Sequence, residues 1–291
     1  MVRGVYDLQK LRIQMGNRIV ANYKTKLGQA PSHPEEELDE DAQAVLKLLR
    51  SEHKLITNGI VAQNTGSRQK KQFKGTEVID SYAEYAMLSQ YVELESKEKY
   101  MFNALEVILT DYPIYNSFLK DVRGVGPAMA AVIISEFDIS KAKYVSSLWK
   151  YAGLDVAEDG KARSKRQEHL RTVEYVSSEG ETKLKASITF NPFLRTKLLG
   201  VLAASFLRSG GSKYSEVYYN YKNRLENSPK HQEKTKKHRH MMAMRYMVKI
   251  FLMDLYANWR AVEGLPVHPP YAEAKLGLKH GVDVGVDHER V

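Results

Sequence analysis

The sequence predicts a mainly α-helical protein, and three observations support this. Apolar residues recur at helical spacing over long stretches, glycine and proline punctuate those stretches, and the first hundred residues show no alternation of strands and helices. The chain has 291 residues, 43% of them hydrophobic, which is enough for a sizeable core and two domains. We expect a helical N-terminal arm, a long coiled-coil-like helix, and a C-terminal helical domain with room for a small β-hairpin.

The N-terminal region, residues 1–76, is predicted to be helical and basic. Apolar residues at helical spacing cover one face from Val5 to Leu27, and Gly28 to Pro34 ends that helix. The opposite face is either an ordinary solvated surface or a nucleic-acid face, because it carries six cations against Asp7 alone. These cations are Arg3, Lys10, Arg12, Arg18, Lys24 and Lys26.

A second helix is predicted from the acidic run at Glu35–Asp41 to about Ile60. We interpret the acids as favourable charges at a helix start rather than as metal ligands, because the helix dipole favours negative charge there. The stretch from Gln63 to Gly75 carries Arg68, Lys70, Lys71 and Lys74 without an acid, and is predicted to be a mobile basic loop that could clamp a nucleic-acid backbone.

Residues 77–112 are predicted to form one long connecting helix, ended by Asp111 and Pro113. Its apolar side chains form a near-heptad stripe, which is typical either of a coiled-coil contact in a homo-oligomer or of a single helix packed on its own core. The stripe consists of Tyr82, Tyr85, Leu88, Val92, Leu94, Met101, Leu105 and Ile108.

The stretch from Phe118 to Phe137 has the form of a helix-hairpin-helix motif. Gly124 and Gly126 can adopt backbone angles closed to other residues, and Pro127 presets the first turn of the following helix. Amides left free by such a turn suit a phosphate oxygen without reading a base. The alternative is a tight αα-hairpin that binds nothing. We expect DNA contacts from Arg123, Gly124, Val125 and Gly126.

The rest of the domain at residues 113–264 is also predicted from local signals. Gly153 should end a helix over Tyr144–Tyr151 with Trp149 as its core anchor, and a β-hairpin is expected around residues 173–187. Asn191 and Pro192 should start a helix whose core stripe continues to Phe206. We expect that stripe at Phe193, Leu194, Leu198, Val201, Leu202 and Phe206.

Two further helices and a tail complete the predicted domain. A tyrosine-rich helix is expected over Ser212–Leu225 and a last helix over His238–Val262, followed by a Pro/Gly-rich tail at residues 265–291. The last helix should bury Met244, Met247, Val248, Phe251, Leu252, Leu255 and Trp259.

The charge predicts a polyanionic partner. Lys+Arg number 44 and Asp+Glu 35, a net charge of +9, and the sign alone does not separate DNA from RNA. Residues 222–249 alone hold nine basic residues against Glu226 and Glu233. We expect further DNA contacts from Lys161, Arg163, Lys183, Lys185, Lys236, Lys237, Arg239 and Arg245.

Several function classes are excluded or disfavoured. The absence of cysteine excludes disulfides, thiolate metal sites and a cysteine nucleophile. The N-terminus lacks the apolar core of a signal peptide, and the longest apolar run, Leu198–Leu207, is too short for a membrane span. We therefore expect a cytoplasmic protein with no membrane partner. We interpret His231, His238 and His240 as a protonatable nucleic-acid face rather than a metal site.

The order of motifs from Tyr112 to Pro270 resembles the C-terminal domain of insertion-sequence transposases related to the Piv invertase. The matching pieces are Arg123–Phe137, Ser146–Val156, Ser177–Leu199 and a C-terminal basic helix. That family combines a RuvC-like domain with DEDD residues, a coiled-coil helix, and this domain with a serine. The resemblance implies a transposase-type domain acting in DNA transposition or site-specific recombination. If the protein is prokaryotic, we expect it to associate with the nucleoid.

The resemblance also implies a serine nucleophile. Ser178 is the first candidate, Ser177 the second and Ser187 the third, and Arg195 would stabilise charge on the phosphate. Lys183 stands where the family has a lysine.

The chain departs from the family in two places. Thr189 is followed by Phe190 instead of the family's lysine and Gly-Asn pair, and no strand-borne aspartate is evident in the first hundred residues. We predict that the RuvC-like metal site is missing, identify no cofactor, and expect Mg²⁺ only if a RuvC-like partner, such as a full-length transposase, supplies it. The alternative function is a non-catalytic accessory protein that binds DNA or structured RNA.

Overall fold

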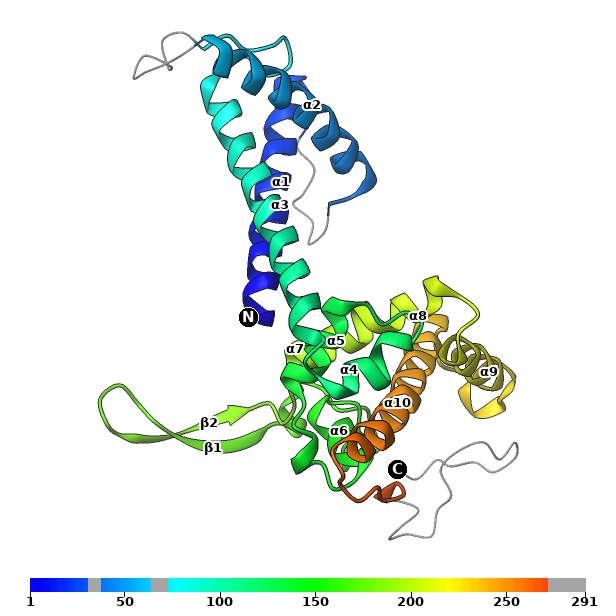
Figure 1. Ribbon diagram of the computed structural model, residues 1–291. Coiled ribbons are helices and arrows are strands. Elements are labelled where there is room, and N and C mark those ends of the chain that lie inside the picture. Colours follow the sequence, from blue (N-terminus) through cyan, green and yellow to red (C-terminus); the bar gives the residue numbers. More distant parts are fainter. Residues whose placement is uncertain (31–37, 64–72, 272–291) are drawn as a thin grey trace. The chain divides into compact units, whose positions relative to one another are not determined.

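The computed structural model describes residues 1–30, 38–63 and 73–271, with backbone alone at 60–63. Their contacts divide the chain into two compact units, Met1–Leu105 and Glu106–Val291, which we call unit 1 and unit 2 and describe separately. Most described residues lie in helices (Figure 1), so the mainly α-helical prediction is confirmed. The dividing point lies within the long helix, whereas the sequence suggested boundaries after residues 76 and 112. Within the described ranges, no helix has an apolar stretch long enough to cross a membrane.

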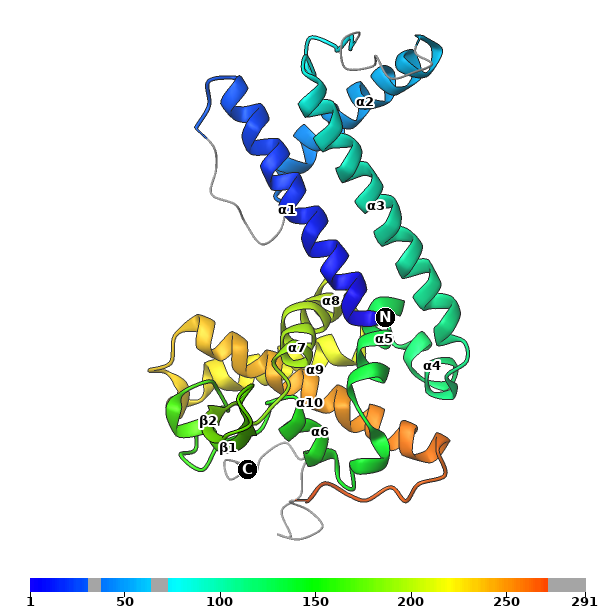
Figure 2. The same ribbon diagram turned by 90° about the vertical axis from the view of Figure 1, so that its left-hand side faces the viewer.

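Unit 1 is built from α1 (Val2–Lys26), α2 (Glu40–Gln63) and α3 (Tyr82–Leu109), the last of which continues beyond the unit. Helices α1 and α3 run alongside each other (Figure 2), and Gln9 of α1 donates a 3.1 Å hydrogen bond to Glu98 of α3. The core between the helices is apolar and includes Ile19, Val20, Leu46, Leu49, Ile56, Ile79, Leu88 and Tyr91.

Helix α3 begins five residues later than the predicted start at Glu77. The Thr76 hydroxyl accepts the Ile79 amide (3.1 Å), and the Ser81 hydroxyl accepts the Glu84 amide (3.3 Å), so these side chains hold a turn and then cap the helix. Of the predicted stripe, Leu88 and Leu105 are buried within the chain while Ile108 is exposed. The intramolecular alternative therefore accounts for the buried positions, and a homo-oligomer contact stays a prediction. The predicted basic loop lies mostly outside the described residues.

Unit 2 is built around its last helix, α10 (Lys236–Val262), which contacts α4, α6, α8 and α9. These elements are α4 (Pro113–Ser117), α6 (Val145–Tyr151), α8 (Ala203–Ser209) and α9 (Lys213–Asn227). Every apolar residue predicted on the buried face of α10 is buried. Gly153 follows α6 with φ +67°, and Trp149 is buried, both as predicted.

The helix predicted from Asn191 to Phe206 is helical throughout but not uniform. It consists of α7 (Pro192–Thr196), a π-helix at Lys197–Leu202 (η5), and α8. The Asn191 side chain caps α7 by accepting the Leu194 amide (3.0 Å), as predicted. Because the π-helix changes the register of the buried face, Val201 is 41% exposed, which corrects its predicted place in the core.

The predicted β-hairpin is present. Strand β1 (Arg171–Val176) pairs antiparallel with β2 (Thr182–Ser187), with Arg171 opposite Ser187 and Val176 opposite Thr182. Figure 1 shows this hairpin extending away from the helices of unit 2.

A candidate phosphate-binding site in unit 2

Two cations of α10 begin the site. Arg245 and Lys249 are four residues apart and therefore share one face of the helix. The Lys249 ammonium lies 4.8 Å from the centre of the Trp149 ring, and the Trp149 indole N–H donates to the Lys249 carbonyl (3.3 Å). The anchor of α6 thus holds this part of α10 in place.

Two further arginines come from α7 and from the loop after α6. Arg195 Nη1 donates to the Arg163 carbonyl (2.7 Å), and its guanidinium lies 4.8 Å from the centre of the Phe190 ring. Arg163 in turn binds the Asp155 carboxylate through Nη2 (2.7 Å) and Nε (3.1 Å).

The negative charge of Asp155, a carboxylate that Arg163 already binds, acts to raise the pKa of Arg195, Arg245 and Lys249. Burial, together with repulsion from Arg195, lowers the pKa of Arg245 to about 10. Burial lowers the pKa of Lys249 to about 8, with repulsion from Arg245 acting in the same direction and Asp155 opposing it. Burial also lowers the pKa of Arg195. Four cations face one carboxylate here, so the site is electropositive at neutral pH.

Two buried polar atoms near these cations have no hydrogen-bond partner in the described part of the chain. They are Arg245 Nε and Thr189 Oγ1, the latter one residue before Phe190. Buried polar groups are almost always hydrogen-bonded, and a phosphate oxygen accepts readily from a guanidinium or a hydroxyl. The arrangement therefore suits an anion. We call Asp155, Arg163, Thr189, Arg195, Arg245 and Lys249 the cationic cluster.

The structure thus brings together three residues that the sequence predicted separately, Arg163, Arg195 and Arg245. Lys249 was included only as part of a basic region, although its spacing of four from Arg245 could have placed it on the same helix face. Thr189 and Asp155 were missed, because nothing in a polar loop signals which of its side chains turn inward.

The structure does not bring Ser177 or Ser178 to Arg195, which corrects the predicted catalytic grouping. Both serines lie in the turn of the β-hairpin, where Ser177 Oγ accepts the Glu181 amide (3.2 Å) and Ser178 is exposed. The ladder separates this turn from the hairpin base by about 17 Å, at about 3.3 Å per residue.

The other predicted groups of the hairpin are also accounted for. Lys183 pairs with Glu179 (3.4 Å) and Glu181 (3.1 Å), so its charge is already balanced. Lys185 lies over the Tyr175 ring, and Ser187 ends β2 at the base.

The turn at residues 123–126, which the sequence predicts to bind phosphate, is formed with one correction to its backbone angles. The Val125 amide donates to the Val122 carbonyl (2.9 Å), and Gly124 has φ +98°, as predicted. Gly126 has φ −86°, an angle open to any residue. A Cβ at Gly124 would lie 2.8 Å from the Phe206 ring, so this glycine also permits close packing on α8. Among the described residues the Gly124 and Gly126 amides make no hydrogen bond.

The remaining cations predicted to contact DNA differ in how exposed they are and in whether they already bind other parts of the chain. Arg123, Lys161, Lys236 and Lys237 are exposed. Arg239 Nη1 donates to the carbonyls of Lys234 (2.6 Å) and His231 (3.1 Å) and so braces the preceding turn, and its contact with DNA stays a prediction. Among the histidines, His240 Nδ1 lies 2.6 Å from the Tyr218 hydroxyl.

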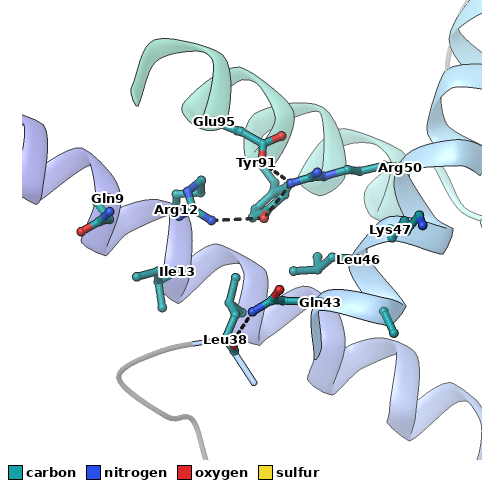
Figure 3. A pocket seen from close by; sticks show the side chains of 11 residues that line it. Gln9, Arg12, Ile13, Leu38, Gln43, Leu46, Lys47, Arg50, Tyr91 and Glu95 are labelled. Atoms are coloured by element: carbon teal, nitrogen blue, oxygen red, sulfur yellow. Dashed lines mark hydrogen bonds and ion pairs between the residues drawn. The ribbon is translucent and has the colours of Figure 1, made fainter. Parts of the chain in front are cut away.

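Unit 1 has a pocket of about 820 Å³, and two of the three cations that line it, Arg12 and Arg50, are already paired with carboxylates. Figure 3 shows Arg12 and Arg50 reaching the Tyr91 hydroxyl, at 3.4 and 3.1 Å. Arg12 also binds Glu98, and Arg50 binds Glu95.

The predicted basic face of α1 is corrected in the same way. Arg12 points inward to Glu98, and Lys26 pairs with Asp80 (2.8 Å), so two of its six cations are neutralised within unit 1.

Comparisons with known proteins add no family. No model of a protein family matches the chain, and no curated protein matches it either.

Proposed function

We propose that the protein binds DNA through its backbone phosphates and acts as a transposase-like protein in DNA transposition or site-specific recombination. The observation that carries the binding is that the buried Arg245 Nε has no hydrogen-bond partner in the described part of the chain, while the one carboxylate acting on Arg195, Arg245 and Lys249 is Asp155, which Arg163 already binds. Half-buried cations with no carboxylate of their own favour a ligand that brings negative charge. A nucleic-acid backbone is such a ligand, and the net charge of +9 favours it over a single small anion.

The family resemblance supports the recombination part of the proposal. The piece Ser146–Val156 contributes Trp149 and Asp155, and the piece Ser177–Leu199 contributes Thr189 and Arg195. The basic C-terminal helix contributes Arg245 and Lys249. Pieces that resemble one family in their order along the chain therefore meet at one cluster.

A non-catalytic accessory protein that binds DNA or structured RNA is the second candidate. The observation favouring it is that the described residues before Glu106 form helices and turns, with no strand to carry the aspartates of a RuvC-like site. Under this candidate a partner, such as a full-length transposase, would supply that domain and its Mg²⁺.

The test is fluorescence anisotropy with a labelled DNA duplex of mixed sequence. We expect affinity to fall on the order of 10³-fold between 50 and 200 mM salt if about six phosphates are contacted. Arg245→Met and Lys249→Met should each weaken binding by about tenfold or more, because each removes a half-buried phosphate contact. Lys99→Met, which removes an exposed cation of α3, is the matched control and should change affinity little.

Two outcomes would contradict the proposal. Wild-type affinity in both cluster variants would remove the cluster from DNA binding, and a flat salt profile would exclude backbone contacts. An unlabelled structured RNA competitor that displaces the duplex at far lower concentration than DNA does would favour the second candidate.

A further inference from the structure

The loop between α6 and β1 brings a hydroxyl, an imidazole and a carboxylate into one chain of hydrogen bonds. Ser164 Oγ lies 2.9 Å from His169 Nδ1, and His169 Nε2 lies 3.2 Å from Asp159 Oδ2. His169 is 3% exposed although it lies in a surface loop, within a short 3₁₀ turn at Gln167–His169 (η4). The three residues are close in sequence, but the sequence pattern did not single out Ser164.

The backbone determines which ring nitrogen carries the proton. The Ser164 amide N–H donates to His169 Nδ1 (3.0 Å), so Nδ1 is the unprotonated nitrogen and Nε2–H donates to Asp159. The Ser164 hydroxyl can therefore donate to the Nδ1 lone pair, which it shares with the Ser164 amide. The Arg166 amide donates to Ser164 Oγ (3.3 Å), which leaves a second lone pair on that oxygen. This is the tautomer that a general base needs.

Asp159 is suited to orient the ring. The Lys161 amide donates to its carboxylate (2.9 Å) and lowers its pKa, with His169 acting in the same direction, so the carboxylate is ionised at neutral pH. An ionised carboxylate on Nε2–H holds the imidazole in position and stabilises the imidazolium that forms when Nδ1 takes a proton.

The cationic cluster begins one residue away. Ser164 follows Arg163, whose carbonyl accepts Arg195 Nη1 (2.7 Å) and whose guanidinium binds Asp155. The backbone that leads into Ser164 is therefore held against the cluster, whose cations would stabilise the charge that develops on the phosphorus of a bound phosphate.

We propose that Ser164 is the nucleophile that attacks a phosphodiester held in the cationic cluster, with His169 as general base and Asp159 as its positioning residue. This inference rests on the proposed function. In the step, a bond forms between Ser164 Oγ and phosphorus while a bond from phosphorus to the leaving deoxyribose oxygen breaks. The hydroxyl proton moves to His169 Nδ1, and the leaving alkoxide takes a proton from water. The product is a DNA phosphodiester of Ser164.

The other serines lack this arrangement in the described part of the chain. Ser178 lies at the hairpin tip, away from the cluster. Ser89 of unit 1 does lie 2.8 Å from His53 Nε2, but its hydroxyl donates to the Tyr85 carbonyl (2.8 Å), so the ring does not accept its proton.

The probe for the chemistry is bis(4-nitrophenyl) phosphate, a diester that needs no target sequence and no acid to expel its leaving group. Attack by Ser164 releases one 4-nitrophenolate and leaves a 4-nitrophenyl phosphate ester on the protein, which intact mass and peptide mapping detect. We expect the label on the peptide containing Ser164. Ser164→Ala should abolish the label, and Ser178→Ala, the matched serine control, should retain it.

His169→Asn tests the base. An asparagine oxygen can still accept the Ser164 amide, so the loop keeps a hydrogen bond, but the residue cannot take the proton. We expect labelling to slow by about 10² or more, because general-base catalysis contributes 10²–10⁴. The wild-type rate should also rise with pH as one group loses its proton, and the variant should lose that rise; a role limited to holding the loop would not move this profile.

Anisotropy with the DNA duplex is measured on the same preparations to separate the two proposals. Ser164→Ala should bind DNA as the wild type does, because a neutral hydroxyl adds little to a salt-driven interface. If DNA binds through the cluster but the wild type takes no label, or Ser164→Ala labels as fast as the wild type, the nucleophile is wrong and the binding function stands. If the cluster variants bind DNA normally, the proposed function is wrong whatever the labelling shows.

Discussion

Unit 1 and unit 2 both hold half-buried arginines, but only in unit 1 does each face a carboxylate of its own. Arg12 binds Glu98 and Arg50 binds Glu95, and the Tyr91 hydroxyl accepts from both arginines. In unit 2, Arg245 and Lys249 share Asp155 with Arg163, and their pKa values are lowered. Paired charges hold helices together, whereas unpaired ones destabilise the fold that carries them. Half-buried cations without a carboxylate of their own, such as Arg245 and Lys249, therefore indicate a ligand site.

The two units can be followed separately, because both tryptophans, Trp149 and Trp259, lie in unit 2. Tryptophan fluorescence during urea unfolding therefore reports unit 2. Far-ultraviolet circular dichroism reports the helices of both units. An unfolding transition that is seen by circular dichroism but not by fluorescence therefore belongs to unit 1.

The largest expected effect is the loss of a paired charge in unit 1. Glu98→Gln removes the carboxylate that binds the guanidinium of Arg12. This pair is largely buried, because the Glu98 side chain is only 9% exposed. We expect the free energy of unfolding of unit 1 to fall by about 3 kcal/mol, since breaking a buried pair strands a charge. The circular dichroism transition should shift and the fluorescence transition should not.

The control for this variant is Glu93→Gln, which breaks the exposed Lys97–Glu93 pair and should cost less than about 0.5 kcal/mol. Equal effects of the two variants would remove the distinction between buried and exposed pairs in this unit.

The next effect has the opposite sign. Lys249→Met keeps an unbranched side chain over Trp149 and removes the unpaired ammonium. We expect unit 2 to gain about 1–2 kcal/mol at pH 7, read from the fluorescence midpoint. A loss of stability would mean that the ammonium is compensated, and the contrast between the units would fail.

The pH dependence sharpens the same comparison. The pKa of Lys249 is about 8 in the folded chain against an ordinary 10.5, so between these values the unfolded chain binds more protons than the folded chain. The stability contribution of Lys249 therefore rises from pH 8 to pH 10.5 and is constant below pH 8. The stability difference between Lys249→Met and the wild type should shrink across this window. If the stability difference stayed constant from pH 8 to pH 10.5, the lowered pKa of Lys249 would not be its cause.

The smallest expected effect is stabilisation by an anion. Sulfate bound to the cationic cluster should raise the unfolding free energy of unit 2 by about 1.4 kcal/mol at ten times its dissociation constant. Sodium chloride at equal ionic strength is the control, and unit 1 should respond alike to both salts. Equal stabilisation of Arg245→Met and the wild type by sulfate would place the anion elsewhere.

The sequence by itself determined most helices of unit 2 and the buried face of α10. Asn191 and Pro192 mark the start of α7, Gly153 follows α6, and the stripe from Met244 to Trp259 faces the core, because capping, backbone freedom and helical periodicity act over a few residues. The β-hairpin at residues 171–187 followed from similar local signals. The nature of the binding partner, a polyanion, stays a prediction from charge.

Only the tertiary structure decided which polar groups meet. Arg12 and Glu98 are 86 residues apart, so no local pattern could show that this cation of a basic face is paired. The same holds for Arg195 beside Arg163, whereas Ser178 resembled a family motif but lies at the tip of an extended ladder. Ser164 and His169 lie in a loop without periodicity, where side-chain direction depends on the backbone path. Periodicity places apolar residues, but the direction of a polar side chain is set by the partners that folding brings to it.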